Sequence, residues 1–548
     1  MVSRSILLLL FHVFSNNIDA QTYSVYFKDK VTSSYTLNNP SAFVAAPLYE
    51  RRTRLGIGFF DTDLPVSSTY LDAIKSFAID YRQASRWLNC AVFDCKNPLT
   101  VDSIRALPFV EKVVCINQPQ PVLKKQSSKF ELLETLANTG DTTNFDYGRA
   151  TIQNEMIRVD FLHKMGYKAD SVRIAVFDVG FANANNIAGF KHLFDENRIV
   201  GTYDIVDQEA NVYNDGAHGT SCLSCMAANE PGKFVGTAPK ALYGLFRTED
   251  DKSETLVEEY NWVFAAEFAE SGGAEVFSTS LGYTDFDDPS TNHSYADLDG
   301  NTTVITKGAN IAARGGIIVV TSAGNEGAKP WYYISAPADA DSALAIGAVN
   351  KDRQVARFSS RGPNAVGRVK PDVCTMGEGP VVYDPSGSIY QSNGTSFACP
   401  ILAGGAACLR QAFPTRSNFD IMEAIRASGH LFKVPNDSFG YGIPDLAIAY
   451  MILLKNDSTT ATSQIINLDI FPNPFTSVLQ VYIVEPYDGK ITLDLFELQG
   501  KLMQSTSVDL SLNARKFIEI NTTNLAQGTY LLKIHGKDYY DLKRVIKE

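Results

Sequence analysis

Four polar residues in this chain have settings suited to hydrolytic chemistry: Asp178, His218, Asn325 and Ser396. Ser396 follows a glycine turn and opens an apolar segment, so a helix start there would present its hydroxyl beside free backbone N–H groups. Such an arrangement suits a nucleophile with an oxyanion site next to it. Taken alone, each residue also has a structural explanation: Ser396 as a helix cap, Asp178 and Asn325 as turn residues, and His218 as a structural histidine.

The elements around these residues decide whether they can meet. Apolar runs bounded by polar or glycine-containing turns predict buried strands at 172–177, 242–246, 276–279, 317–321 and 344–349. Amphipathic stretches fall between them, with one apolar face made by Leu256, Tyr260, Val263, Phe264 and Phe268. This βαβ alternation predicts an α/β unit, a mostly parallel sheet flanked by helices, with a site beyond the carboxyl ends of its strands. Asp178 and Asn325 would both lie at that edge.

The order of these residues along the chain resembles that of a subtilisin-type serine protease. Four motifs carry the resemblance: VFDVG with Asp178, HGTSC with His218, SAGNEG with Asn325 and NGTSFACP with Ser396. Their intervals of 40, 107 and 71 residues are compatible with the family. The resemblance covers roughly residues 150–450. It implies a catalytic triad of Asp178, His218 and Ser396, with Asn325 as a donor to the oxyanion.

The same resemblance implies where a protein or peptide substrate would bind. Ser280, Leu281 and Gly282 are similar to the family's substrate-pairing strand, and Ala323 and Gly324 precede the oxyanion asparagine. We therefore expect these five residues to contact substrate. The chemistry needs no cofactor, and no residue is assigned as a metal ligand. Structural calcium is common in the family, but the sequence identifies no ligand cluster for it.

The favoured hypothesis is a secreted serine endopeptidase that works through an acyl-enzyme intermediate. Two positions depart from the usual pattern: Val179 where a small hydroxyl residue often follows the aspartate, and Phe397 where methionine is common after the serine. Neither change removes a reacting group. The alternative is a catalytically inactive subtilisin-like binding or surface protein, which would be expected to lack a reacting group. A thiol or metal protein built on Cys222 and Cys225 is a more distant alternative.

Two further units flank the protease-like region. Residues 22–140 predict a small α+β domain and linker, because apolar residues recur at helical spacing from Tyr70 to Tyr81 and residues 109–116 alternate like a strand. The resemblance implies that this unit is propeptide-like, since it occupies the place of a subtilisin-type propeptide; an accessory N-terminal domain is the alternative. After the catalytic unit at 141–455 comes a linker at 456–464. Residues 465–548 alternate at period two and predict a small antiparallel β-sandwich. This last unit resembles the sorting domains of type IX secretion cargo, which implies the secretion machinery as a partner.

Composition and targeting signals indicate an exported protein. Arg4, an apolar run at 6–14 and a small residue at Ala20 predict a signal peptide over residues 1–20. With the sorting domain, this predicts export through the periplasm across an outer membrane, to the cell surface or the medium. No later segment is apolar enough for a transmembrane anchor, and a net charge of -12 argues against nucleic acid. Eight cysteines permit disulfides, but their pairing cannot be read from the sequence.

Overall fold

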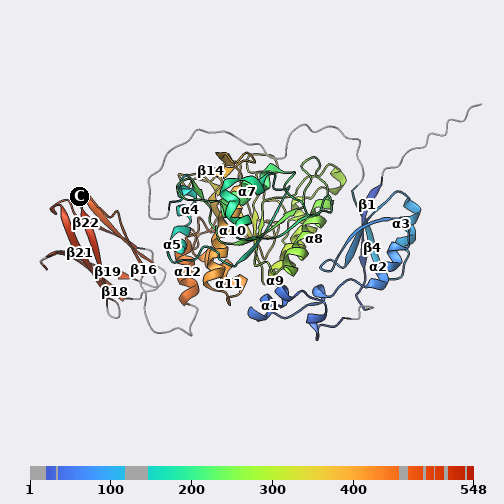
Figure 1. The fold of residues 1–548 in the computed structure, drawn as a ribbon, viewed down its shortest axis with the longest axis horizontal. Coiled ribbons are helices and arrows are strands. Elements are labelled where there is room, and N and C mark those ends of the chain that lie inside the picture. The colour runs from blue at the N-terminus through green and yellow to red at the C-terminus, as the bar shows by residue number, and fades with distance from the viewer. Residues whose placement is uncertain are drawn as a thin grey trace, which may run out of the picture.

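The structure, a computed structural model, describes residues 20–31, 35–117, 146–455, 467–484, 489–498, 500–510, 516–536 and 540–548. Three folded units follow one another along the chain (Figure 1). The predicted signal peptide, apart from Ala20, and both predicted linkers, at 118–140 and 456–464, lie outside the described residues. Within the described ranges, no helix is long and apolar enough to cross a membrane.

The N-terminal unit is the expected α+β domain. Its antiparallel sheet has the order β2-β3-β1-β4, with β1 (Gln21–Phe27), β2 (Asp80–Ser85), β3 (Cys90–Cys95) and β4 (Val110–Asn117). Helices α2 (Ser68–Lys75) and α3 (Pro98–Arg105) pack on one face of this sheet. The spacing from Tyr70 to Tyr81 overstates the helix, because Tyr81 lies on β2 opposite Phe93.

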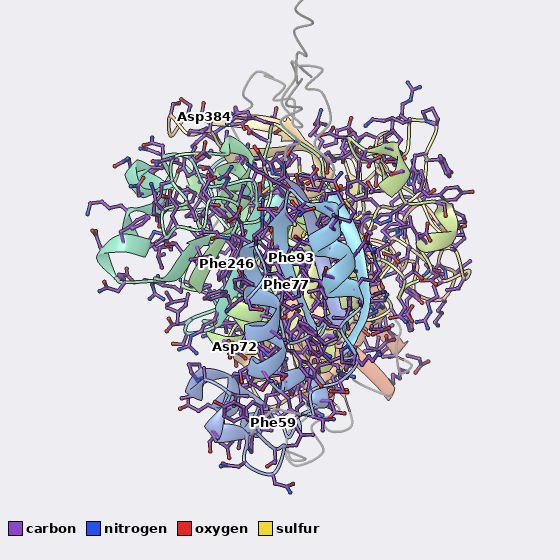
Figure 2. The ribbon with its side chains drawn as sticks, turned by 90° about the vertical axis from the view of Figure 1, so that its right-hand side faces the viewer. Phe59, Asp72, Phe77, Phe93, Phe246 and Asp384 are labelled. Carbon is purple, nitrogen blue, oxygen red and sulfur yellow. The ribbon has the colours of Figure 1, made fainter. Side chains whose placement is uncertain are left out.

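An insertion separates β1 from α2 in this unit. It contains helix α1 (Ala46–Arg54) and two short turns, η1 (Pro40–Ala42) and η2 (Asp61–Asp63). The other face of the N-terminal sheet packs against the central unit, where Trp87 and Val92 join the same apolar core as Tyr260 and Phe264. The hydroxyls of Tyr26 and Tyr260 are 2.7 Å apart across this contact. In Figure 2 the N-terminal unit faces the viewer, with Phe77 and Phe93 labelled.

The central unit is built on a seven-stranded sheet of order β13-β12-β11-β10-β5-β9-β6, in which all neighbours are parallel. The strands are β5 (Arg173–Asp178), β6 (Ile199–Asp204), β9 (Leu242–Arg247), β10 (Val276–Thr279), β11 (Ile318–Ser322), β12 (Leu344–Val349) and β13 (Val373–Met376). All five predicted strands are present, within one residue at each end. The edge strands β6 and β13 were not predicted.

Helices cover both faces of this sheet, as expected for an α/β unit. Ile174 and Val176 of β5 face the core shared with α7 (Ala217–Ala227) and α10 (Thr395–Ala412). Ala175 and Phe177 face the opposite core, shared with α8 (Val257–Ser271) and α9 (Val304–Arg314). The smaller elements are α4 (Thr151–Met156), η3 (Ala184–Asn186), η4 (Ala188–Phe190), α5 (Val159–Lys164), α6 (Lys191–Asp195), β7 (Asn229–Glu230), β8 (Phe234–Val235), η5 (Pro289–Thr291), η6 (Tyr295–Asp297), β14 (Glu378–Tyr383), β15 (Ile389–Asn393), α11 (Asn418–Ala427) and α12 (Leu446–Lys455).

The C-terminal unit has two antiparallel sheets, of orders β16-β17-β20 and β19-β18-β21-β22. Its strands are β16 (Asn467–Phe471), β17 (Val478–Val484), β18 (Gly489–Glu497), β19 (Leu502–Leu510), β20 (Lys516–Asn521), β21 (Gly528–His535) and β22 (Tyr540–Lys547). Val481 and Ile520 from one sheet share a core with Leu495 and Leu532 from the other. The unit is therefore a β-sandwich.

Candidate active site

Asp178 and His218 meet at the carboxyl end of β5. Asp178 is the last residue of that strand, and His218 lies in the first turn of α7. A Cβ on Gly219 would lie 2.1 Å from the Gly180 carbonyl oxygen, so only glycine lets α7 start this close to the strand end. His218 Nδ1 is 2.8 Å from Asp178 Oδ1, and the two residues are 5% and 1% exposed. A buried carboxylate in this position fixes the tautomer and orientation of the imidazole.

Two hydrogen bonds converge on one oxygen of Asp178. Val179 N donates to Oδ1 at 2.9 Å, in addition to the contact from His218. Among the described residues, none donates a hydrogen bond to Asp178 Oδ2. Val179 has no hydroxyl, so its side chain cannot donate a hydrogen bond to Asp178 Oδ2.

Ser396 is the second residue of α10, directly after Thr395 and with Gly394 as the helix cap. It is 4% exposed. Because Pro400 has no N–H, the carbonyl of Ser396 has no helical donor four residues on. Ser280 Oγ donates to that carbonyl at 2.8 Å instead, and Cys222 Sγ lies 3.4 Å from it. The position of the serine is thus set by side chains from outside its own helix.

Contacts between α7 and α10 bring the serine to the histidine. Cys222 Sγ, which contacts the Ser396 carbonyl, is also 3.7 and 3.8 Å from the two ring nitrogens of His218. The ring of Phe397 lies 5.6 Å from the His218 ring, centroid to centroid. Asp178, His218 and Ser396 therefore gather in one place, although 218 residues separate the first from the last.

Asn325 reaches the start of α10 from the turn after β11. Its Oδ1 accepts hydrogen bonds from Thr395 N at 3.0 Å and from Thr395 Oγ1 at 3.1 Å. Both of these contacts use Oδ1, and the amide also has two N–H donors on Nδ2. The backbone N–H of Ser396 lies in the first turn of the helix, where N–H groups have no helical acceptor. Asn325 Nδ2 and Ser396 N are thus the two donors available for a developing oxyanion.

The predicted substrate-contacting residues have different environments. Ser280, Leu281 and Gly282 continue β10 beyond its last paired residue, which leaves their main chain outside the sheet. The side chain of Leu281 is buried in the core under α8, and Ala323 is fully buried. Gly324 has a φ of +107°, and a Cβ there would lie 2.8 Å from two serine hydroxyls.

The sequence did not identify Thr395 or Cys222 as contributors to the candidate active site, because their contacts depend on residues far along the chain.

Cysteines and acidic side chains are the other groups with potential chemistry. All eight cysteines are free thiols, and burial, followed by the charge of Asp178, raises the pKa of Cys222. In the described part of the chain, two groups bring three potential metal ligands within 4.8 Å: Asp178 with His218 and Cys222, and Glu249 with Glu254 and Glu258. The first uses atoms of the triad. The second offers only oxygens, the donor type that calcium prefers.

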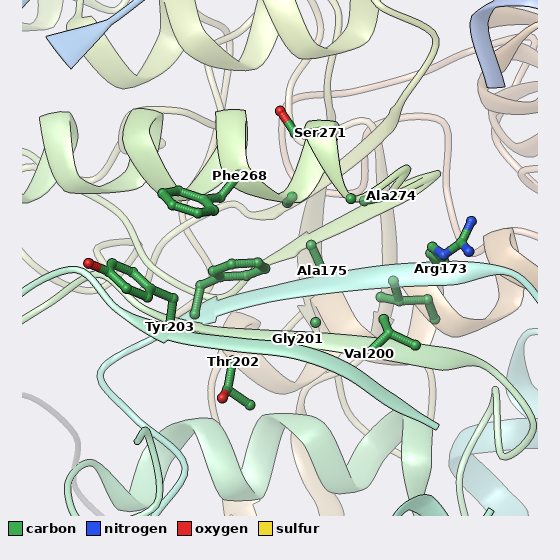
Figure 3. Close-up of a pocket in the computed structure, with 14 residues that line it drawn as sticks. Arg173, Ala175, Val200, Gly201, Thr202, Tyr203, Phe268, Ser271 and Ala274 are labelled. Atoms are coloured by element: carbon green, nitrogen blue, oxygen red, sulfur yellow. The ribbon is translucent and has the colours of Figure 1, made fainter. Parts of the chain in front are cut away.

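A cavity of about 320 Å³ lies elsewhere, against β5, β6, β9 and α8. Figure 3 shows Tyr203 and Phe268 at one end and Arg173 at the other. Its β5 residues, from Arg173 to Ala175, belong to the amino-terminal half of that strand. The triad stands at the carboxyl end, so this cavity is separate from the candidate active site.

Comparison with known proteins places these groups in a family. The subtilase family model matches residues 169–442, half of the 548-residue chain. The chain belongs to the subtilase family. Subtilisin from Bacillus pumilus is 30% identical over 294 residues, which cover 52% of this chain and 92% of that protein. Subtilisin E from Bacillus subtilis (strain 168) is 30% identical over 293 residues, which cover 52% of this chain and 67% of its own length.

The flanking units of this subtilase match family models as well. Residues 22–131 match the Peptidase S8 propeptide domain of Bacteroidota, and residues 469–548 match the secretion system C-terminal sorting domain. A mouse protein, the membrane-bound transcription factor site-1 protease, is 28% identical over 316 residues, 55% of this chain and 27% of that protein. The chain is therefore a subtilisin-like serine peptidase with a propeptide domain and a sorting domain, which confirms the family expected from its motifs.

Proposed function

We propose that this subtilase is a secreted endopeptidase that hydrolyses peptide bonds through Asp178, His218 and Ser396. The observation that carries the proposal is the buried 2.8 Å contact between His218 Nδ1 and Asp178 Oδ1, set beside the helix start that bears Ser396. A base held in one tautomer next to a serine at a helix N-terminus is the arrangement that acyl transfer requires.

The proposed mechanism has two halves. His218 Nε2 takes the proton of the Ser396 hydroxyl as Oγ attacks the substrate carbonyl, and Asp178 stabilises the imidazolium that forms. Asn325 Nδ2 and Ser396 N donate to the oxyanion of the tetrahedral intermediate. His218 then protonates the leaving amine, which leaves an acyl-enzyme. Water, activated by the same histidine, hydrolyses the ester and restores the serine.

Substrate would bind along the segment after β10. A peptide paired with main-chain groups of Ser280 to Gly282, which lie outside the sheet, would present its carbonyl to Ser396, and Gly324 would leave room beside Asn325. Buried Leu281 and Ala323 would act by supporting these segments from the core. A structural calcium, if this subtilase uses one, would suit the oxygens of Glu249, Glu254 and Glu258; the peptide hydrolysis itself needs no metal.

The units that flank the protease would direct its export from the cell. We assign residues 1–20 to a signal peptide, 22–140 to the propeptide with its linker, 141–455 to the protease and 456–464 to a second linker. Residues 465–548 would direct passage from the periplasm across an outer membrane, to the cell surface or the medium. The propeptide keeps the protease inactive during this passage.

Labelling with a fluorophosphonate tests the function. We expect the reagent to modify wild-type protein and to leave the Ser396→Ala variant unmodified, with N-terminal sequencing showing propeptide cleavage only in the wild type. Labelling that persists in Ser396→Ala would refute the nucleophile. If the wild type is folded and fails both to label and to cleave peptides, the inactive binding protein becomes the better explanation.

A further inference from the structure

A buried arginine lies beside the strand end that carries Asp178. Arg247 is the last residue of β9, and it pairs in register with Asp178 on the neighbouring strand β5. It is 4% exposed. Its Nε donates a hydrogen bond to the carbonyl oxygen of Val179 at 3.2 Å. Arg247 therefore contacts the residue that directly follows the aspartate of the candidate triad.

Two carboxylates hold the guanidinium of Arg247 in place. Its Nη1 donates to Asp204 Oδ2 at 2.8 Å and to Asp207 Oδ2 at 2.5 Å. The other oxygen of Asp204 accepts from Asp207 N at 2.9 Å, so both carboxylates belong to one turn at the end of β6. A guanidinium is a rigid plane that stays charged in proteins. Fixing Nη1 therefore also fixes the Nε–H that donates to Val179.

Arg247 and the residue after it hold the two peptide groups on either side of Val179. Thr248 N donates to the carbonyl oxygen of Asp178 at 3.0 Å, and Arg247 Nε donates to that of Val179. Because peptide groups are planar, the orientations of two successive ones fix φ and ψ of the residue between them. The main-chain conformation at Val179 is thus set from β9.

The carbonyl of Val179 also lies against the turn that begins α7. A Cβ on Gly216, the cap residue of α7, would come within 2.3 Å of Val179 O. His218 is two residues beyond Gly216. The carbonyl that Arg247 holds is therefore in direct contact with the helix start that carries the histidine. A shift of this carbonyl would change how Asp178 and His218 meet.

The main chain of Val179 has particular weight in this site, because its side chain has no hydroxyl. Among the described residues, the hydrogen bonds to the Asp178 carboxylate come from His218 and from Val179 N, and both reach Oδ1. The orientation of the carboxylate accordingly depends on a backbone N–H. That N–H points at Oδ1 only while Val179 keeps the conformation that Arg247 and Thr248 impose.

We propose that Arg247 is a positioning residue of the candidate active site, which keeps Asp178 and His218 in contact by holding the carbonyl of Val179. The inference rests on the proposed function, in which His218 is the base. Arg247 takes no part in proton transfer and acts only through the main chain. It is a support from a neighbouring strand for an aspartate that no side-chain hydroxyl assists.

The first test removes the Nε–H and keeps the charge. In Arg247→Lys a methylene group replaces Nε, and the ammonium stays opposite the buried carboxylate of Asp204, so folding stability should be retained. We expect kcat on one peptide substrate to fall about tenfold, with KM within about threefold of wild type, in protein whose active sites are titrated to completion. A purely structural role would instead let lysine restore both stability and kcat.

The second test removes both members of the buried pair. Arg247→Met with Asp204→Asn leaves no buried charge uncompensated, and asparagine keeps an oxygen for Asp207 N. Its kcat should be about tenfold to a hundredfold below that of Asp204→Asn alone, which keeps the donor to Val179. Arg426→Leu is the matched control for a broken ion pair, because Arg426 pairs at 2.6 Å with buried Asp372, just before β13. It should leave kcat unchanged.

A third measurement reports the geometry without catalysis. In the Ser396→Ala chain with isotope-labelled histidine, the Nδ1 proton that His218 shares with Asp178 should give a proton NMR signal at low field. Both Arg247 variants should shift this signal upfield or lose it to exchange with water, and Arg426→Leu should leave it in place.

Wild-type kcat and an unchanged NMR signal in folded Arg247→Lys would overturn the proposal. A double variant with the kcat and the signal of Asp204→Asn would overturn it as well. Failure of the proposed function is separate, because it appears in fluorophosphonate labelling of the wild type and of Ser396→Ala, where Arg247 is intact.

Discussion

The amide of Asn325 provides a sharp test of the proposed chemistry, because its orientation is fixed. Thr395 donates to Oδ1 from both N and Oγ1, at 3.0 and 3.1 Å, which leaves Nδ2 as the donor to the oxyanion in the proposed mechanism. We predict that Asn325→Leu lowers kcat about 10²–10³-fold, equivalent to ~2.7–4 kcal/mol, which is the effect of losing such a donor in subtilisin. KM should stay near its wild-type value, because the hydrogen bond strengthens mainly in the transition state.

The assay measures kcat and KM on one peptide substrate, with protein from which the propeptide has been removed to the same extent and with active sites titrated by fluorophosphonate. Asn325→Asp keeps an oxygen for Thr395 but turns a second carboxylate oxygen toward the oxyanion, so it should be at least as damaging. Thr395→Val keeps the amide and one of its two fixed contacts, and should cost about tenfold or less. A kcat for Asn325→Leu within about threefold of wild type would refute the oxyanion role.

Other changes test neighbouring parts of the argument. Ser280→Ala removes the hydroxyl that donates to the carbonyl of residue 396. In the Ser396→Ala background it should lower the free energy of unfolding in urea by about 1–3 kcal/mol, and an unchanged unfolding midpoint would contradict this. Asp178→Asn should retain the fold and lower kcat by about 10⁴-fold, since His218 loses its preferred tautomer, and loss of less than tenfold would exclude that role. Burial raises the pKa of Glu270, but the charges of Arg51, Arg86 and Arg52 outweigh it and lower the pKa to about 2 in the docked state. Because an unpaired glutamate titrates near pH 4.3, the contact between the N-terminal and protease units should be fully stable above about pH 5 and weaken up to tenfold per pH unit as pH falls toward 2, measured by hydrogen exchange of α1 in the Ser396→Ala chain, whereas Glu270→Gln should lack this acid response.

The positions of Asp178, His218 and Ser396 in the fold could be predicted because each residue follows a local pattern. Asp178 ends an apolar strand, His218 and Ser396 open apolar helices, and the parallel βαβ order brings such ends to one edge of the sheet. The edge strands were missed for a physical reason. β6 lacks a buried apolar run, because Asp204 is its only buried residue. β13 is only four residues long. Pairing with neighbours stabilises both strands where their own periodicity is weak.

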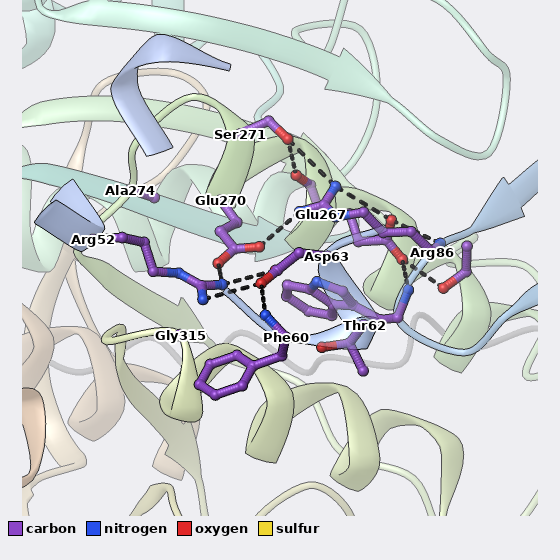
Figure 4. A network of polar contacts seen from close by, with 12 residues as sticks. Arg52, Phe60, Thr62, Asp63, Arg86, Glu267, Glu270, Ser271, Ala274 and Gly315 are labelled. Carbon is purple, nitrogen blue, oxygen red and sulfur yellow. Dashed lines mark hydrogen bonds and ion pairs between the residues drawn. The ribbon is translucent and has the colours of Figure 1, made fainter. Parts of the chain in front are cut away.

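The contacts that position the site could not be read from the sequence. Thr395 fixes an amide 70 residues away, and Ser280 donates to a carbonyl 116 residues away. The contacts of Arg51 and Arg52 with Glu270 join residues still farther apart along the chain, and Figure 4 shows that of Arg52. Arg51 and Arg52, and Glu267 and Glu270 on α8, have the composition of solvated helix faces, and only the docking of two domains buries them. A sequence pattern reports what one element prefers, so it cannot assign a charge whose partner belongs to another domain.

Helix α8 connects the buried contact between Arg51 and Glu270 to the segment that follows β10. Glu270 lies in its last turn, and Trp262, about 12 Å along the helix axis, donates from Nε1 to Thr279 Oγ1 at 3.2 Å. Thr279 is the residue before Ser280, whose hydroxyl donates to the carbonyl of Ser396. The N-terminal sheet packs on the same helix at Tyr260 and Phe264. The N-terminal unit therefore contacts α8 at its middle and in its last turn, and α8 in turn contacts the strand end that precedes Ser280.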